Sequence, residues 1–189
     1  MSTGRINDVM SVDEYLAGEL VSRTKHEYIA GAVFAMAGAK NAHHRIAGNA
    51  FLAFGTQLKG TRCTPYNSDT KIRIRIKGHV RFYYPDLSVI CKSNDLNESF
   101  QDQPVVVVEV LSESTRRLDD GEKRDAYFTI PSLTHYILLE QDSPIAIVYR
   151  RTDEHFERHE CTNPADVIVI DGLDLSLPLQ ELYDGVLSN

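Results

Sequence analysis

The stretch that decides the fold is Val105–Leu111, with the sequence VVVVEVL. A run that is apolar on both faces is typical of a central strand covered on both sides. Upstream, Lys71–Lys77 (KIRIRIK) alternates strictly, which predicts a strand with one apolar and one basic face. Phe82–Lys92 predicts another strand, with Pro85 near its beginning, where a proline is tolerated.

The N-terminal third predicts two helices and a hairpin. Ser11 and Glu14 have the spacing of a capping box, which opens a short helix to Leu20. His26–Ala37 (HEYIAGAVFAMA) predicts a hairpin that turns at its central Ala-Gly pair. Residues 42–58 repeat apolar side chains at helical spacing, so we expect a helix whose buried face carries Ala42, Ile46, Ala50, Phe51, Phe54 and Leu58.

The C-terminal half continues the alternation of helix and strand. Asp119 or Asp120 is expected to cap a helix that runs to Ile130, before a proline. Four strands are expected after it, at His135–Glu140, Ile145–Arg151, Val167–Ile170 and, more weakly, His155–Glu160. This order predicts an α/β fold with a mixed central sheet, in a single domain over residues 1–189 whose first ten residues are flexible.

Composition excludes several classes of protein. The chain has 189 residues, of which 42% are hydrophobic, so it is neither disordered nor fibrous. No apolar run approaches the roughly 20 residues of a membrane span, and no secretory signal is visible. Cys63, Cys91 and Cys161 are odd in number and widely spaced, so we expect free thiols and a soluble cytoplasmic protein.

The charge is unevenly distributed along the chain. The net charge is −7, which argues against a protein that coats nucleic acid. The segment Lys59–Arg81, however, has seven basic residues and one acid, so it carries +6 and leaves −13 for the rest. Arg73 and Arg75 on the basic strand are candidates for contact with a phosphate backbone, and a solvated outer face is the alternative.

Glu109 is the most informative residue, because it interrupts the valine run of the most buried strand. A buried carboxylate costs several kcal/mol unless it is paired, protonated or bound to a metal. Asp86 enters the strand after Pro85, and if the two strands are neighbours the two carboxylates converge. Two carboxylates, a backbone carbonyl and waters form a shell that Mg²⁺ accepts. A strand-end ion pair for Glu109 and a turn or cap for Asp86 are the structural alternatives.

Lys123 is singled out by helix geometry. It shares a face with Ala126, Tyr127 and Ile130, so it points inward with the apolar stripe. Near two carboxylates its ammonium would orient water and stabilise charge on a phosphate. The alternative is a stem packed on the sheet with a solvated amine. Since methionine keeps the apolar length of the stem, the sequence predicts that Lys123→Met folds normally and loses cleavage.

Weaker candidates complete the survey of polar residues. Arg116 and Arg117 are expected either to bind a phosphate or to pair with the aspartates that follow them. His155 and His159 have the spacing of a metal pair on a helix, but their surroundings predict an exposed hairpin with solvated histidines. The adjacent histidines at 43 and 44 open a helix and make a weak zinc candidate.

A group of these motifs resembles the Uma-two family, which is classified with restriction endonucleases in the PD-(D/E)XK nuclease superfamily. The resemblance covers about residues 11–187, and its motifs are Pro85-Asp86, Glu109-Val110-Leu111-Ser112, Ser114-Thr115-Arg116-Arg117, Gly121-Glu122-Lys123 with Tyr127, His26-Glu27-Tyr28-Ile29-Ala30-Gly31 and His44. It implies a restriction-endonuclease-like core with extra antiparallel hairpins, Mg²⁺ or Mn²⁺ dependence and phosphodiester hydrolysis.

The resemblance also implies roles for individual residues. Asp86 and Glu109 match the metal-binding acids, and Glu27 matches a recurrent glutamate that we count among the catalytic candidates. The superfamily's usual lysine stands two residues after the glutamate, where this chain has Leu111. The family moves that lysine to the following helix, and Lys123 matches the moved position.

The sequence therefore predicts a metal-dependent endonuclease that acts on DNA, in a homodimer away from any membrane. Two other functions stay open. One is a catalytically silent, dimeric interaction protein on a nuclease-like fold, which the acidic net charge and Leu111 favour. The other is a metal-dependent hydrolase of a phosphoester that is not a nucleic acid.

Overall fold

The computed structural model describes residues 9–113, 115–153 and 155–186. The expected flexible N-terminus therefore lies mostly outside the described residues, as does Ser114 of the family motif. The elements of the two larger sheets are β1 (His26–Ile29), β2 (Ala32–Ala35), β3 (Thr64–Asn67), β4 (Lys71–Ile76), β5 (His79–Tyr83), β6 (Leu87–Ile90), β7 (Phe100–Gln101), β8 (Pro104–Leu111), β9 (His135–Glu140), β10 (Ala146–Arg151) and β11 (Phe156–Cys161).

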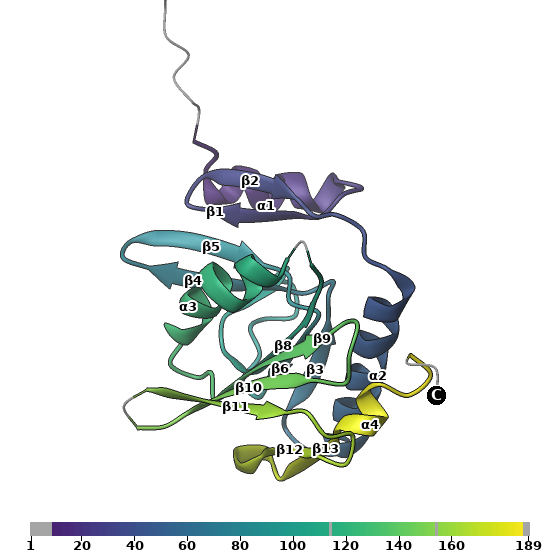
Figure 1. Ribbon diagram of the computed structural model, residues 1–189. Coiled ribbons are helices and arrows are strands. Elements are labelled where there is room, and N and C mark those ends of the chain that lie inside the picture. Colours follow the sequence, from purple (N-terminus) through teal and green to yellow (C-terminus); the bar gives the residue numbers. More distant parts are fainter. Residues whose placement is uncertain (1–8, 114, 154, 187–189) are drawn as a thin grey trace, which may run out of the picture.

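A mixed six-stranded sheet forms the centre of the molecule, in the order β11-β10-β9-β8-β6-β3 (Figure 1). Its strand β8 is parallel to β9 and antiparallel to β6. This confirms the prediction that the valine run is a central strand. The predicted α/β fold with a mixed central sheet, flanking helices and additional hairpins is confirmed as well.

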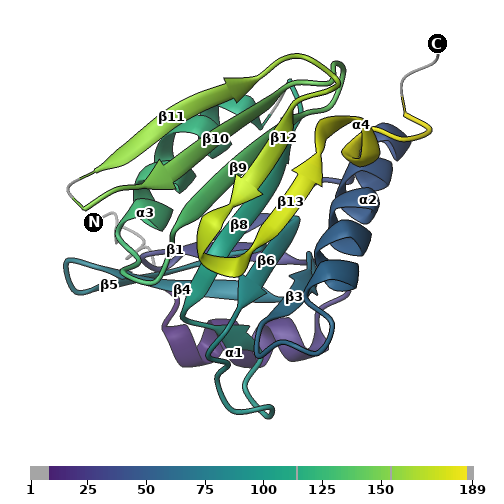
Figure 2. The same ribbon diagram turned by 90° about the horizontal axis from the view of Figure 1, so that it is seen from below.

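The two faces of β8 pack against different layers, as its period of two requires. Val106, Val108 and Val110 pack in one core with α2 (Asn41–Gln57) and with the hairpin of β12 (Val167–Ile170) and β13 (Leu175–Pro178). Figure 2 shows that hairpin and α2 on the same side of the sheet, with α4 (Leu179–Leu182) beside them and the short helix η2 (Asp171–Leu173) between the two strands. The opposite face, with Val107 and Leu111, packs on α3 (Arg124–Phe128) and β4. Glu109 lies between Val107 and Leu111 in the alternation along β8, so it belongs to this second face.

A five-stranded sheet in the order β2-β1-β5-β4-β7 lies on that second side. Its outer face is covered by α1 (Val12–Val21), which begins at the predicted capping box of Ser11 and Glu14. Tyr15 of this helix packs its ring 5.0 Å from Tyr28 and 5.2 Å from Phe82. The hairpin of β1 and β2 is thereby fixed above β5 and the start of α3 (Figure 1).

Three predictions of local structure were wrong. Phe82–Lys92 is not one strand, because it breaks at Pro85 into β5 and β6 of different sheets. The helix before Ile130 begins with a π-helical turn, η1 (Leu118–Lys123), so Asp119 lies inside the helix and is buried, and neither aspartate caps it. Phe51 was expected on the buried face of α2, but it is 39% exposed, whereas Ile46 and Phe54 are buried.

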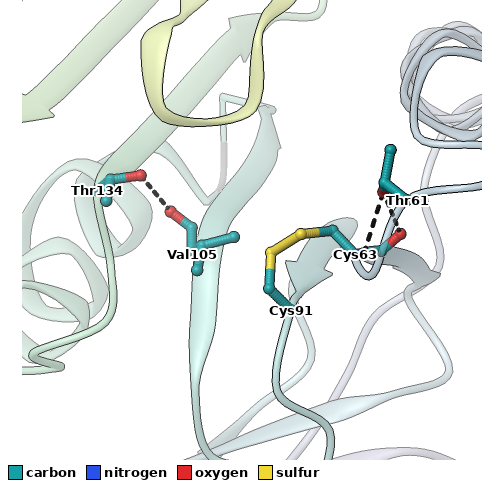
Figure 3. The surroundings of a disulfide bond; sticks show 5 residues. All are labelled: Thr61, Cys63, Cys91, Val105 and Thr134. Atoms are coloured by element: carbon teal, nitrogen blue, oxygen red, sulfur yellow. Dashed lines mark hydrogen bonds between the residues drawn. A yellow bond between two sulfur atoms is a disulfide. The ribbon is translucent and has the colours of Figure 1, made fainter.

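The cysteine prediction was also wrong. Cys63 and Cys91 form a disulfide, and only Cys161 is a free thiol in the described part of the chain (Figure 3). The β3–β6 ladder ends at the pair Thr64 and Ile90. Cys63 comes directly before Thr64 and Cys91 directly after Ile90, so the ladder brings the two cysteines together. The disulfide removes the free-thiol support for a cytoplasmic location, which stays a prediction. None of the described helices is long and apolar enough to span a membrane.

Candidate active site

The catalytic candidates meet where the two larger sheets join. A cleft of about 1200 Å³ opens there, and all four sequence candidates, Glu27, Asp86, Glu109 and Lys123, line it. Glu27 comes from β1, Glu109 from β8, and Lys123 from the end of η1. Asp86 follows Pro85 in the link between β5 and β6, the chain segment that passes from one sheet to the other.

The side chains of Asp86 and Glu109 each accept a hydrogen bond from the backbone of the opposite segment. The Val110 amide donates to Asp86 Oδ2 at 2.7 Å, and the Asp86 amide donates to Glu109 Oε2 at 3.3 Å. The break at Pro85 makes this possible, because the antiparallel pairing of β6 with β8 starts only at Leu87, which is opposite Val108. The condition stated in the sequence analysis is met, because β6 and β8 are neighbours, and each carboxylate keeps one oxygen outside these two bonds.

Lys123 lies among three carboxylates. Its Nζ is 2.7 Å from Glu27 Oε1, 3.3 Å from Asp119 Oδ1 and 4.0 Å from Glu109 Oε1. All four side chains are buried, with at most 6% of any residue exposed. Three carboxyl groups around one ammonium cannot all ionise without leaving the cluster with a surplus of negative charge in a low-dielectric environment.

The energetics of the cluster follow from this imbalance. Burial raises the pKa of Glu109 well above its ordinary range, and the nearby Asp119, Asp86 and Glu27 raise it further, although Lys123 opposes the shift. Burial alone would lower the pKa of Lys123, but the carboxylates of Glu109, Glu27 and Asp119 raise it above its ordinary value. Lys123 is therefore a permanent cation, and its chemistry is that of a charge and a hydrogen-bond donor.

The donor set fits a hard divalent cation. Glu109 Oε1 is buried and accepts no hydrogen bond from any described residue. The described residues contain no group of three or more His, Cys, Asp and Glu side chains arranged to hold a metal ion. A cation here would therefore take the two carboxylates of Asp86 and Glu109, with water and substrate oxygens in its remaining positions, as Mg²⁺ commonly does.

Two residues of the site were missed from the sequence. Asp119 belongs to the lysine cluster, and its i,i+4 spacing to Lys123 on an inward helix face was an available signal. His43, from the first turn of α2, places Nε2 2.9 Å from Asp86 Oδ1. Its neighbour His44 is exposed, lines the same cleft and has its ring centre 5.7 Å from that of His43. Only the position of the two histidines at the start of α2 hinted at a role.

The four arginine candidates lie in different settings. Arg73 makes a two-pronged contact with Asp102, at 2.7 Å from both Nε and Nη2, and Arg75 lies 3.3 Å from the same carboxylate. Arg116 pairs with Glu140. Arg117 is exposed and has no ion pair with any described residue. None of the four lines the cleft.

The alternative partners expected for Arg116 and Arg117 were wrong, because Asp119 and Asp120 pair with Lys123 and Arg124. The expectation for the other histidine pair is confirmed. His155 and His159 are exposed, with His159 on the edge strand β11, so they do not share a helix face.

Comparison with known proteins agrees with this geometry. The Uma2 family model, described as "Putative restriction endonuclease", matches residues 12–180. An uncharacterized protein of Synechocystis sp. is 33% identical over 178 residues, covering 94% of this chain and 93% of the relative. A second one is 29% identical over 136 residues, covering 70% and 76%.

A solved structure shows the same fold. The crystal structure of "a putative nuclease belonging to DUF820" from Anabaena variabilis superposes with a TM-score of 0.71, at 18% identity, and covers 88% of this chain and 93% of its own. With a family model matched over nearly its whole length, this chain belongs to the Uma2 family.

Proposed function

We propose that the protein is a metal-dependent endonuclease of the PD-(D/E)XK type that hydrolyses phosphodiester bonds of DNA. The observation that carries the proposal is the meeting of Asp86, Glu109 and Lys123 in one cleft, from three separate parts of the chain. The family description and the nuclease-like fold support the same class of activity.

Each residue has a defined task in this proposal. Asp86 and Glu109 bind the cation, and His43 holds Asp86 in place through Oδ1. Mg²⁺ or Mn²⁺, when bound there, supplies a Lewis acid that polarises the phosphate and makes a bound water more acidic. Lys123 orients the attacking water or stabilises the charge that develops on the phosphate. Glu27 and Asp119 set the position of the Lys123 ammonium.

The presence of Leu111 at the position of the superfamily's usual lysine favours a catalytically silent protein. The position two residues after Glu109 is filled by a side chain that is 1% exposed in the hydrophobic core. The distance of 4.0 Å between Lys123 Nζ and Glu109 Oε1 supports the view that the helix lysine replaces the missing one.

Of the four arginine candidates, we assign the strongest contact with the nucleic-acid backbone to Arg117, the one without an ion pair among the described residues. We also propose a homodimer in the cytoplasm.

The test combines metal binding and cleavage. We expect wild-type protein to bind Mn²⁺ in calorimetry and to nick supercoiled DNA with Mg²⁺ or Mn²⁺. Asp86→Asn and Glu109→Gln should fold and lose both properties, because each removes one of two charged ligands. Arg158→Gln, an exposed change on β11, is the matched control and should keep both. Metal binding without cleavage of DNA or RNA would favour the silent protein, and unchanged Mn²⁺ affinity in both carboxylate variants would contradict the site.

A further inference from the structure

The ring of Phe34 lies beside the catalytic cluster and is left uncovered. Phe34 of β2 pairs directly with Glu27 of β1. Directly opposed residues of an antiparallel pair project from the same face of the sheet, with Cβ atoms about 5 Å apart. The ring is therefore a direct neighbour of the carboxylate that contacts Lys123, and it lines the same cleft.

The hairpin of β1 and β2 buries one face and exposes the face that carries Phe34. Tyr28 and Val33, the next opposed pair, pack into the aromatic core under α1. Phe34, in contrast, is 52% exposed, although the cleft beside it is large enough to admit a ligand. Phe34 thus presents a large apolar side chain at the edge of a polar site.

The charges along the cleft differ from one wall to the other. The lining residues from the segment 23–44 include three cations, Arg23, Lys25 and Lys40, of which Lys25 pairs with Asp69, and one acid, Glu27. The lining from residues 109–142 has five acids and one cation: Glu109, Glu113, Asp119, Glu122, Asp142 and Lys123. Arg23 and Lys40 are exposed and make no ion pair with any described residue. A polyanion is therefore favoured beside Arg23 and Lys40 of the segment that contains Phe34 and disfavoured beside the acids of the segment 109–142.

We propose that Phe34 is a stacking platform for an unpaired nucleobase of a nucleic acid strand that lies along Arg23 and Lys40. The proposal rests on the proposed nuclease function and adds a preference for single-stranded or locally unpaired substrate. Every nucleobase has a π-face, so the ring would select for base accessibility and not for sequence. In a regular duplex the bases are stacked on one another, and the ring could not reach a base face.

The test measures binding to a single-stranded DNA oligonucleotide that contains 2-aminopurine, whose fluorescence reports stacking, with Ca²⁺ as the cation. Phe34→Ala should weaken single-strand binding by about tenfold, within the range that base–aromatic contacts produce. Phe34→Trp should keep the affinity within about twofold and restore the fluorescence change. Binding to a blunt duplex should change by less than about twofold in either variant.

Two controls separate stacking from other effects. Phe51→Ala removes a phenylalanine of α2 that is 39% exposed and does not line the cleft, so it should bind like wild type. Phe34→Leu keeps an apolar side chain without a planar face and should behave like Phe34→Ala. Wild-type affinity in Phe34→Ala or Phe34→Leu would overturn the stacking proposal and leave the nuclease proposal standing. Wild-type protein that binds no nucleic acid would overturn both.

Discussion

Two clusters of charged side chains, one around Lys123 and one around Asp102, have opposite imbalances of charge. Around Lys123, three carboxylates share one ammonium, and every group is buried. Around Asp102, two guanidinium groups share one carboxylate, and the Arg75 side chain is 59% exposed. Water screens the surplus positive charge of the second cluster, but not the surplus negative charge of the first.

The two clusters also differ in how well their charged groups are satisfied. Arg73 also stacks on Phe100, with its guanidinium carbon 4.0 Å from the ring centre, and Asn94 donates to Asp102. These contacts join β4 to the segment around β7 and leave the carboxylate well satisfied. In the Lys123 cluster, Glu27 and Asp119 depend on that one ammonium, and Glu109 Oε1, 4.0 Å from it, accepts no hydrogen bond from described residues. Buried charge that lacks such partners is what a cation-binding site requires before its cation arrives.

The largest expected effect comes from Lys123→Met. The sequence alone predicts normal folding, but the structure shows three buried carboxylates that would lose their only cation. Breaking a buried pair costs about 3–5 kcal/mol, so we expect a loss of this size in unfolding free energy by urea denaturation in metal-free buffer. A double variant, Lys123→Met with Glu27→Gln, should recover part of the loss. A single variant as stable as wild type would show that the cluster is protonated or hydrated at neutral pH.

Arg73→Met provides the matched change in the second cluster. It removes two hydrogen bonds to a charged partner and the stacking on Phe100, in a place where the side chain is 21% exposed. We expect a loss of about 2 kcal/mol, because hydrogen bonds to charged groups contribute about 1.5–3 kcal/mol and water replaces part of the contact. If this loss equals that of Lys123→Met under the same denaturation conditions, burial does not distinguish the two clusters.

The pH dependence of stability should have opposite signs in the two clusters. The pKa of Glu109 is raised above its ordinary value of 4.5, so the folded state keeps a proton that the unfolded state loses, and stability declines as pH rises above 4.5. Although burial opposes it, the hydrogen bonds from Arg73 and Asn94 and the charges of both arginines lower the pKa of Asp102 below 3.8. Its contribution to stability is present above pH 3.8 and is lost as the pH falls through the lowered pKa.

Glu109→Gln tests this sign directly. Replacing a buried carboxyl group whose ionisation is unfavourable should stabilise the metal-free protein at neutral pH by about 1 kcal/mol, or about 2–4 °C in melting temperature. It should also flatten the decline above pH 4.5, whereas Asp102→Asn should alter only the acid side of the profile. Melting curves from pH 3 to 8 in a chelating buffer measure both effects, and an unchanged neutral-pH melting temperature would contradict the raised pKa.

Sequence patterns predicted the parts of this comparison that depend on spacing. The valine run placed Glu109 in a central strand, and the helix period placed Lys123 on the inward face with Ala126 and Tyr127. Asp119 was missed although its i,i+4 spacing to Lys123 was visible, because LDDGEK predicts a helix cap there and no pattern in it announces the π-helical turn that buries Asp119. The partner of Arg73 and Arg75 was missed for another reason.

Two features that the sequence did not predict, the Asp102 contact and the disulfide, depend on pairing between distant strands. Asp102 follows the two-residue strand β7, which is too short to show a period, and its contact with Arg73 needs the pairing of β4 with β7. The disulfide likewise needs β3, whose sequence TPYN has no alternation, to pair with β6. Local patterns carry no information on such partners, because the pairing is decided by the packing of the whole sheet.

The smallest expected effect concerns the arginines as nucleic-acid contacts. Arg75 already shares Asp102 with Arg73, so Arg75→Ala removes a charge that is partly compensated, whereas Arg117 is exposed without an ion pair among the described residues. Each phosphate contact changes the slope of log affinity against log salt by about 0.9 on double-stranded DNA. We therefore expect Arg117→Ala to reduce that slope by about this amount and Arg75→Ala to leave it nearly unchanged, with less than about 0.5 kcal/mol lost in stability in either variant. Fluorescence anisotropy with a labelled duplex between 50 and 200 mM salt measures the slopes. If Arg75→Ala lowers the slope as much as Arg117→Ala does, the basic face of β4 binds the backbone despite Asp102, and the second cluster is then part of the nucleic-acid interface.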